Sequence, residues 1–348
     1  MLRLGIIGSG RLGSFHADKA AKHAAVQLIG VADSCEYRRK ELATKHGIAD
    51  YASPAELLRQ VDAVVIAAPT LFHHSLGKEA LLAGVHVLME KPLAVSEREA
   101  KELVELAESQ KRVLQVGHVE QFNPAWELAT PVLQAIQEGA RAIITAERTS
   151  GYTFRSTDIG VVHDLMVHDL DLILSVVSSP IRSIEATGFH VIGSEEQGGH
   201  EDIAHARLQF ENGTVAEIRA SRVDFEARRK MRIQTAHLSA EIDFASRETK
   251  IIQASGAVVR GEFSPVSLGD KDPADLAKTF MSEQFSCTKT AREAVDALVL
   301  EMDDFVRAIQ EGRPSQVPGS RALKAVAAAD AISQIIGTKI IATGCFRC

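Results

Sequence analysis

Cysteine is scarce in this chain, with four residues in 348. That number is too small for a disulfide scaffold, and Cys35 and Cys287 have no second cysteine close in sequence. Cys345 and Cys348 form a single CxxC pair. Because a zinc site normally needs two such pairs or added histidines, a frayed tail is favoured over metal or redox chemistry, and no metal site is predicted.

Long apolar runs are also lacking. The longest uninterrupted run covers residues 63–69, far short of the roughly 20 residues that cross a bilayer, so no membrane segment is expected. The N-terminus leads from Leu4, Ile6 and Ile7 directly into a glycine-rich turn, without the separate apolar region and cleavage site of a signal peptide. These features predict a cytoplasmic protein.

An excess of positive charge is absent as well. The 39 Lys and Arg residues stand against 46 Asp and Glu residues, which gives a net charge of −7. This balance opposes non-specific binding to nucleic acid or to an anionic membrane. The expected partner is therefore a small molecule, which can still be an anion where basic side chains gather locally.

The length and composition favour a two-domain globular protein. A single hydrophobic core rarely supports 348 residues, and 45% hydrophobic with 24% charged residues is ordinary for a folded soluble domain. The pattern of the chain predicts domains at residues 1–120 and 121–317, with a C-terminal helix and tail at 318–348 that return to the first domain.

The first part of the chain alternates short apolar runs with helical patterns, which is typical of a doubly wound parallel sheet. The predicted strands are 3–8, 26–33, 63–67, 86–89 and 113–116. The predicted helices are 12–22, 37–46, 54–60, 76–83 and 96–109. Ser96 and Glu99 form a capping box for the last of them.

The second part has β character. The predicted strands are 142–149, 183–192, 203–210, 215–222, 231–237 and 240–244. Asn212 and Gly213 separate two of them, a strong hairpin signal, so an antiparallel sheet is expected. Helices are predicted at 160–178, 291–311 and 320–336. The fold class is thus α/β plus α+β.

The first turn carries a GxGxxG motif. Gly8 permits a tight turn, Gly10 lets the backbone approach a pyrophosphate, and Gly13 permits close packing of the helix. Arg11 and Leu12 lie inside the motif and are counted with the cofactor contacts.

Asp33 ends the second predicted strand, 20 residues after Gly13. A carboxylate there accepts hydrogen bonds from the ribose hydroxyls of NAD and repels the extra phosphate of NADP. NAD is therefore the predicted cofactor. NADP is less favoured but stays open, because Arg38 and Arg39 follow closely and could meet that phosphate.

Asp164 and His168 stand four residues apart on a predicted helix, with Asp171 three further, so all three share a face. An imidazole oriented by a carboxylate suits a general base. By residue type alone, a cap or a surface contact is the commoner explanation of such a pair.

Four segments in order resemble the Gfo/Idh/MocA family: GSGRLGSFHA, AAPTLFHH, AGVHVLMEKPLA and HDLMVHDLD. The resemblance covers nearly the whole chain. It implies an N-terminal Rossmann domain that binds NAD(P). It also implies a C-terminal open antiparallel sheet that supplies substrate contacts and often an oligomer interface, so a homo-oligomer through this sheet is expected.

The same resemblance implies roles for individual residues. Lys91, in the motif of Glu90, Lys91 and Pro92, lies where substrate meets nicotinamide, and the bond before Pro92 is often cis. His168 is the base and Asp164 its partner. The residues assigned to the cofactor are, besides the glycine motif and Asp33, Pro69, His73, Glu90 and Lys91; His16 is expected to pack beneath the cofactor.

The segment GHVEQFNPA, residues 117–125, resembles the subgroup that oxidises the 3-hydroxyl of UDP-N-acetylglucosamine and related nucleotide sugars. Glu120, Asn123 and Arg155 are accordingly assigned to the substrate, with Lys91 and His168. The subgroup usually has arginine where this chain has Gln121.

Basic residues gather further along the chain and could meet a diphosphate, although for each one a solvated surface position is the commoner case: Arg219, Arg222, Arg228, Arg229, Lys230 and Arg232. A dehydrogenase of a free sugar or cyclitol, or an NAD-dependent glycosidase, remains the alternative to a nucleotide-sugar dehydrogenase. A module that senses NAD without catalysis is disfavoured because Lys91, Asp164 and His168 are retained.

Overall fold

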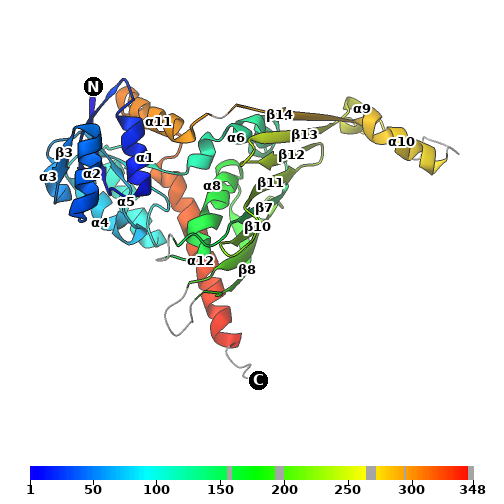
Figure 1. Cartoon of the computed structure of the whole chain (residues 1–348). Coiled ribbons are helices and arrows are strands. Elements are labelled where there is room, and N and C mark those ends of the chain that lie inside the picture. Colours follow the sequence, from blue (N-terminus) through cyan, green and yellow to red (C-terminus); the bar gives the residue numbers. More distant parts are fainter. Residues whose placement is uncertain (155–158, 193–199, 264–271, 294, 344–348) are drawn as a thin grey trace.

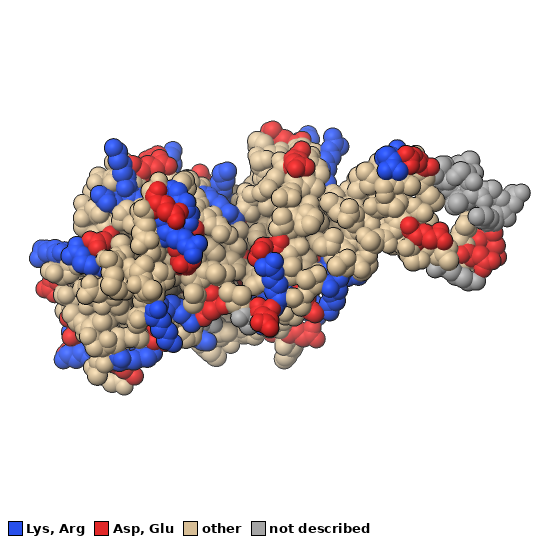
Figure 2. Space-filling view, turned by 90° about the horizontal axis from the view of Figure 1, so that it is seen from above, with Lys and Arg blue, Asp and Glu red and all other residues tan. Residues whose placement is uncertain are grey.

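A computed structural model describes residues 1–154, 159–192, 200–263, 272–293 and 295–343. Two sheets, each with its own helices, lie side by side and are connected by long C-terminal helices (Figure 1). Basic and acidic side chains are interspersed over the face shown in Figure 2, in accord with the nearly balanced charge of the chain. The two predicted sheets are both present.

The N-terminal sheet is parallel and has the order β3-β2-β1-β4-β5-β6. Its strands are β1 (Leu2–Ile7), β2 (Val26–Ala32), β3 (Ala49–Tyr51), β4 (Ala63–Ile66), β5 (His86–Met89) and β6 (Leu114–Val116). The helices are α1 (Arg11–Ala20), α2 (Glu36–His46), α3 (Pro54–Leu58), α4 (His73–Leu82) and α5 (Glu97–Ser109). The predicted Rossmann architecture is confirmed, and only the short strand β3 was not predicted.

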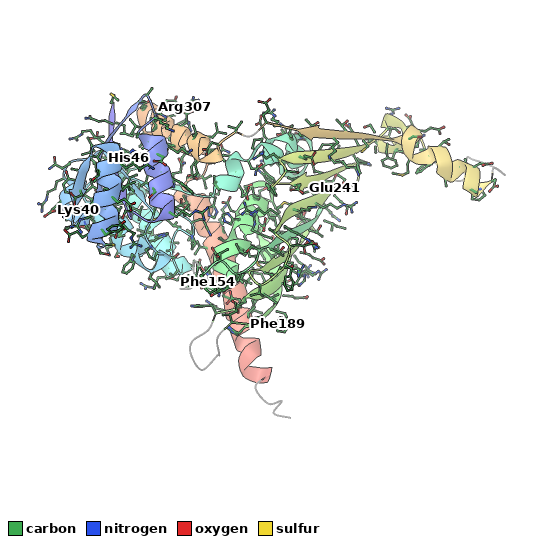
Figure 3. All side chains as sticks on the ribbon, viewed as in Figure 1. Lys40, His46, Phe154, Phe189, Glu241 and Arg307 are labelled. Atoms are coloured by element: carbon green, nitrogen blue, oxygen red, sulfur yellow. The ribbon has the colours of Figure 1, made fainter. Side chains whose placement is uncertain are left out.

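The C-terminal sheet has eight strands in the order β14-β13-β12-β11-β7-β10-β9-β8. They are β7 (Ile143–Thr149), β8 (Ile181–Phe189), β9 (Ile203–Phe210), β10 (Val215–Ser221), β11 (Arg228–Gln234), β12 (Leu238–Asp243), β13 (Glu248–Ala254) and β14 (Phe285–Ala291). One face carries polar and charged side chains such as Glu241 (Figure 3). We expected an antiparallel sheet, and this prediction is wrong for one pair of strands, because β7 and β10 pair in parallel.

The hairpin between β9 and β10 forms at the predicted turn. Gly213 has φ +86°, in the left-handed region that favours glycine, and Asn212 Oδ1 accepts a hydrogen bond from the Thr214 amide at 2.9 Å.

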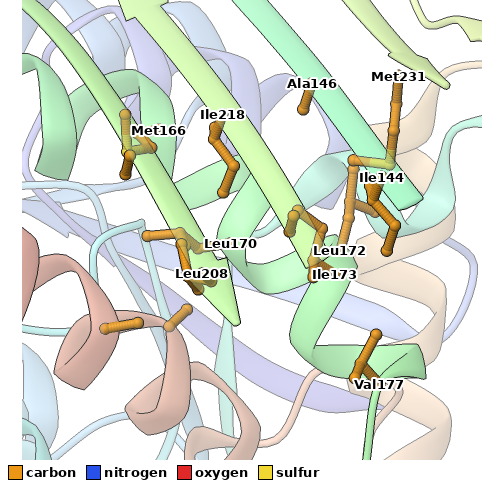
Figure 4. Packing of buried hydrophobic residues seen from close by; sticks show 14 of the residues in the cluster. Ile144, Ala146, Met166, Leu170, Leu172, Ile173, Val177, Leu208, Ile218 and Met231 are labelled. Atoms are coloured by element: carbon orange, nitrogen blue, oxygen red, sulfur yellow. The ribbon is translucent and has the colours of Figure 1, made fainter. Parts of the chain in front are cut away.

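Helices cover the other face of this sheet. They are α6 (Pro124–Leu128), α7 (Thr130–Gln137) and α8 (Val167–Val176), and α8 is preceded by a π-helical turn, Val162–Met166. Leu170, Ile173 and Val177 pack against Leu208 and Ile218 of the sheet (Figure 4). The buried apolar stripe of α8 thereby fixes the helix to the sheet and sets the position of the Asp164–His168 segment at one end of this core.

Two long helices close the described chain, α11 (Ala297–Glu311) and α12 (Gly319–Thr343). Phe305 of α11 packs in the N-terminal core. Helix α12 contributes Ala322 and Val326 to the N-terminal core, and Ala329 and Ile332 to the core of the second sheet. Helix α12 therefore returns to the first domain as expected and also belongs to the second; the exact domain limits at 120 and 317 stay a prediction.

An arm projects from the edge of the second sheet (Figures 1 and 2). It comprises α9 (Gly256–Val259), α10 (Pro273–Gln284) and the adjoining strands β13 and β14. Neither these helices nor these two strands were predicted. For β14 the reason is that it is exposed along nearly its whole length and lacks an apolar alternation.

In the described part of the chain, no helix combines the length and the apolar character that a membrane span needs. Cys35 and Cys287 are free thiols, whereas Cys345 and Cys348 lie outside the described residues.

Candidate active site

The glycine-rich turn joins β1 to α1. Gly8 has φ +96°, and a Cβ atom on Gly13 would lie only 1.8 Å from the Gly8 carbonyl oxygen, so both positions require glycine. Gly10 caps α1, and a Cβ on it would meet nothing within 4 Å. Open space therefore lies before the helix N-terminus, where a pyrophosphate would meet backbone N–H groups. Arg11 and Leu12, the next residues, are both exposed.

Asp33 follows β2 beside this turn. Its carboxylate accepts hydrogen bonds from the Ser9 amide at 2.7 Å, the Ser9 hydroxyl at 2.8 Å and the Cys35 amide at 2.7 Å. Burial by itself would raise the pKa of Asp33, but the Ser9 and Cys35 amides outweigh it and the pKa lies below its usual value. The carboxylate is thus ionised at neutral pH.

Arg38 and Arg39, the two residues that could bind the extra phosphate of NADP, differ in their surroundings. Arg38 Nη2 lies 3.7 Å from Asp33 Oδ1, and its side chain is 54% exposed. Arg39 Nε instead donates to Asp50 at 3.1 Å. Only Arg38 of this pair is therefore placed beside the Asp33 carboxylate. With the open front at Gly10, the turn and Asp33 fit a dinucleotide.

His73 contacts the loop that carries Lys91. Its Nδ1 lies 2.7 Å from the Pro92 carbonyl oxygen and its Nε2 lies 2.9 Å from that of Ala68. The Lys91–Pro92 peptide bond is cis, as the resemblance implied. Pro69, the other predicted cofactor contact here, is exposed at the start of the same segment. His73 thus connects the loops that follow β4 and β5.

His16 and Glu90 form a buried pair at the end of β5. The His16 Nε2 atom lies 2.7 Å from Glu90 Oε1, and the two residues are 1% and 7% exposed. Burial would raise the pKa of Glu90, yet the hydrogen bond to His16 and the charge of Lys91 hold it below its usual value. Helix α1 is thereby linked to the Lys91 loop.

Lys91 reaches across to the second domain. Its Nζ donates to the Asp164 carbonyl oxygen at 2.6 Å and to Asp164 Oδ1 at 2.9 Å. The ammonium group has three N–H donors, so one remains for a further acceptor. The two side chains are 15% and 17% exposed, which leaves the pair partly open to a ligand.

His168 is the second residue of α8, whose regular turns follow the π-helical turn that contains Asp164. A π-helical turn changes the angular spacing of residues four apart. The carboxylate of Asp164 contacts Lys91, and among the described residues no hydrogen bond joins it to His168. The expected orientation of His168 by Asp164 is therefore not seen in this arrangement.

The surroundings of His168 favour the neutral form of its imidazole. Burial lowers its pKa well below the usual value, and the cations Lys91 and Arg148 lower it further. Its Nδ1 is buried without a hydrogen-bond partner among the described residues, while the residue as a whole is half-buried. Nε2 is thus the nitrogen available to a ligand.

His118 is a site residue that the sequence analysis missed. Its ring meets that of His168 edge-on, with centroids 6.1 Å apart, and it is 1% exposed. Both ring nitrogens lack a hydrogen-bond partner in the described part of the chain. A signal was available, since His118 follows β6 at the carboxyl edge of the parallel sheet, where ligands bind.

Glu120 and Asn123, predicted to bind substrate, have internal partners. Glu120 Oε1 accepts from the Arg148 guanidinium at 2.8 Å, and Asn123 Nδ2 donates to Glu120 Oε2 at 2.9 Å. Arg148 also binds Asp169 at 2.9 and 3.0 Å, which makes a buried cluster of one cation and two carboxylates. Their roles toward substrate stay predictions. Arg155, the third such residue, lies outside the described residues.

Gln121 binds a buried carboxylate where the subgroup has arginine. Its Nε2 donates to Asp171 Oδ2 at 2.5 Å. Arg321 of α12 lies 3.5 Å from Asp171 Oδ1. The cation beside Asp171 therefore comes from the C-terminal helix.

No three His, Cys, Asp or Glu side chains lie together as a metal site would require, within the part of the chain that the structure describes. The candidate site thus consists of a dinucleotide-type turn, a lysine shared by both domains and a neutral histidine.

Two family models match this chain. Residues 2–118 match the oxidoreductase family with an NAD-binding Rossmann fold, GFO_IDH_MocA. Residues 137–241 match the GFO/IDH/MocA C-terminal domain.

Curated and solved relatives extend the match over nearly the whole chain. The UDP-N-acetylglucosamine 3-dehydrogenase of Acidithiobacillus ferrooxidans is 36% identical over 94% of this chain and 95% of that protein. A solved structure of the enzyme from this organism superposes with a TM-score of 0.81 and 32% identity, covering 97% of this chain and 98% of its own. The D-glucoside 3-dehydrogenase of Escherichia coli is 28% identical over 62% of this chain and 68% of that protein.

Proposed function

Because the chain belongs to the Gfo/Idh/MocA family of oxidoreductases with an NAD-binding Rossmann domain, we propose that it oxidises the C3 hydroxyl of UDP-N-acetylglucosamine or a closely related nucleotide sugar. The hydride passes to NAD and the product is a 3-keto sugar. The observation that carries this proposal is the 36% identity to a UDP-N-acetylglucosamine 3-dehydrogenase over 94% of the chain.

The site residues account for the proton and for the developing charge. NAD, held by the glycine-rich turn and Asp33, would supply the hydride acceptor for C3. His168 takes the hydroxyl proton on Nε2, because its lowered pKa keeps the ring neutral. The third donor of Lys91 holds the hydroxyl oxygen and stabilises the negative charge that develops on it. C3 loses a hydride and its oxygen a proton, which leaves a ketone.

A direct assay tests the reaction. Protein, NAD and UDP-N-acetylglucosamine are mixed, and both the reduced cofactor and the mass of the nucleotide sugar are followed. Loss of two hydrogens with UDP still attached supports the proposal. Release of UDP or of free sugar indicates a glycosidase. Because the oxidation can be uphill, a trapping amine and a transaminase are added, and absence of the keto product even then contradicts the proposal.

A dehydrogenase of a free sugar is the second candidate, favoured by the similarity to D-glucoside 3-dehydrogenase. That reaction needs no anion-binding group. In the same assay, reduction of NAD with a free glucoside but not with the UDP-sugar selects this candidate.

We also propose that NAD is preferred over NADP and that the chain forms a homo-oligomer through the second sheet. The ionised Asp33 supports the cofactor preference. On the face of the sheet away from α8, the apolar side chains of Ile143 and Phe189 are 58% and 59% exposed, and contact with a second copy of the chain would remove them from water. Light scattering of the unmodified protein and of an Ile143→Lys variant tests the interface.

A further inference from the structure

Six basic residues lie in β10, directly after it or in β11, and they divide into two groups by their contacts. Five of the six pair with carboxylates: Arg219 with Glu147 and Asp224, Arg222 with Asp202, Arg228 with Glu147 and Glu226, Lys230 with Asp243, and Arg232 with Glu241. These five are neutralised within the chain. None of them therefore stands out as a cation reserved for a ligand.

Arg229 is the sixth of these residues and forms the second group by itself. Its side chain makes no hydrogen bond or ion pair with any residue in the described ranges, and it is exposed. It alternates along β11 with Met231 and Ile233, which are 1% and 0% exposed, so it points to the helix-covered face. Lys230 and Arg232 point to the opposite face.

The neighbour of Arg229 across the sheet connects it to the catalytic helix. Arg229 pairs in register with Arg148 of β7, and residues directly opposite lie on the same face. Arg148 is bound by Asp169, the residue after His168. The positive charge of Arg229 adds to the burial that lowers the pKa of His168, and it offsets part of the burial that raises the pKa of Asp169.

We propose that Arg229 binds the phosphate attached to the anomeric carbon of the substrate, and that this contact selects a glycosyl phosphate over a free sugar. The inference rests on the proposed function. With C3 held at Lys91 and His168, the anomeric phosphorus is four covalent bonds away, and Arg229 lies on the helix-covered face opposite Arg148, which binds Asp169, the residue after His168. A guanidinium matches two phosphate oxygens at once.

A purely structural role gives a different expectation. The buried cluster of Arg148, Glu120 and Asp169 carries one positive and two negative charges, and Arg229 could serve only to balance it. In that case removal of Arg229 lowers the melting temperature and leaves ligand affinity unchanged.

The test measures anion binding apart from catalysis. Protein saturated with NAD is titrated with UDP and with UDP-N-acetylglucosamine by calorimetry, using the unmodified chain, Arg229→Gln, Arg229→Lys and the control Arg232→Gln. The control removes a cation from the same strand but from the opposite face. We expect Arg229→Gln to raise both dissociation constants roughly tenfold or more, Arg229→Lys to raise them less, and Arg232→Gln and the affinity for NAD to stay unchanged.

Three results overturn the inference: unchanged affinity in Arg229→Gln, an equal loss in Arg232→Gln, or no binding of UDP to the unmodified protein. If Arg229→Gln fails to fold, Arg229→Lys with a salt titration decides, because a phosphate contact weakens with ionic strength. Arg229-dependent binding of UDP without oxidation of the UDP-sugar leaves the phosphate site standing and contradicts only the proposed reaction.

Discussion

Lys91 and Asp164 are joined by two hydrogen bonds from one ammonium group, to the carboxylate at 2.9 Å and to the backbone carbonyl at 2.6 Å. Lys91 follows a strand of the parallel sheet, and Asp164 precedes the helix that covers the other sheet. The cation that we assign to the substrate hydroxyl is therefore positioned by the opposite domain.

Replacing the two partners should have graded effects. Lys91→Met removes the donor to the developing oxyanion, and we expect kcat/KM for the sugar to fall by roughly 10²–10³. Asp164→Asn leaves the backbone contact of Lys91 in place, so a loss of about tenfold is expected. Steady-state kinetics with NAD affinity as the control measure both, and equal losses in the two variants would argue against this division of roles.

His168→Asn should separate chemistry from cofactor binding. We expect turnover to fall by roughly 10²–10⁴-fold because the proton acceptor is lost, while NAD still raises the melting temperature. Single-turnover reduction of NAD is the measurement. An unchanged rate assigns the base to another group, with Lys91 the next candidate.

The acid limb of the pH–rate profile should lie below pH 6.5, the ordinary pKa of histidine, because burial and nearby cations lower the pKa of His168. A base must be unprotonated, so kcat/KM should hold level as pH falls through that value and decline only further down. An acid limb above it contradicts the assignment.

The lowered pKa of His168 should also make the folded protein less stable as the pH falls. Below pH 6.5 the unfolded chain binds a proton at His168 that the folded chain excludes, so the free energy of unfolding falls by up to about 1.4 kcal/mol per pH unit. Urea midpoints from about pH 8 to about pH 5, compared with His168→Asn, isolate this contribution.

Two glycines of the first turn should differ sharply when changed to alanine. Gly13→Ala places a Cβ 1.8 Å from the Gly8 oxygen, so it should cost at least about 1–3 kcal/mol of stability. Gly10→Ala meets nothing within 4 Å, so the melting temperature without cofactor should be unchanged, while NAD affinity should fall roughly 10- to 100-fold. Thermal scans with and without NAD distinguish the two, and similar behaviour of both variants would count against a dinucleotide here.

Asp33→Ala should weaken NAD more than NADP. The variant loses the acceptor for the ribose hydroxyls, about 1–3 kcal/mol, and also the repulsion of the extra phosphate near Arg38. Titration of both cofactors into both proteins measures the change in ratio. Tighter binding of NADP by the unmodified chain would reverse the assignment.

Sequence patterns predicted those strands whose residues are buried in a regular pattern. Strand β4 is buried along its whole length, so its apolar run marked it within one residue. The turn at Asn212 and Gly213 fixed one hairpin. The parallel pairing of β7 with β10 could not be predicted, because alternation reports which face is buried and not which strand lies alongside.

The candidate site shows a similar limit. Lys91, Asp164 and His168 were each identified from motifs, but the contact between Lys91 and Asp164 depends on how two domains pack. The π-helical turn over Val162–Met166 has no signature in residue spacing, so a regular helix suggested the wrong partner for Asp164. The position of His118 after β6, at the carboxyl edge of the parallel sheet, was a signal for a ligand site, but a single histidine there forms no spaced motif that assigns it a role.

The contacts of helix α12 determine the order in which the two halves of the protein can complete their folding. It supplies Ala322 and Val326 to the core of the N-terminal domain and Ile332 to that of the sheet domain. During synthesis, the dinucleotide-binding half emerges from the ribosome long before this helix. Until α12 follows, the apolar surface that Ala322 and Val326 cover in the N-terminal core stays exposed. Neither half has all of its native apolar contacts until α12 is in place, so the last step in the folding of both halves depends on the same helix.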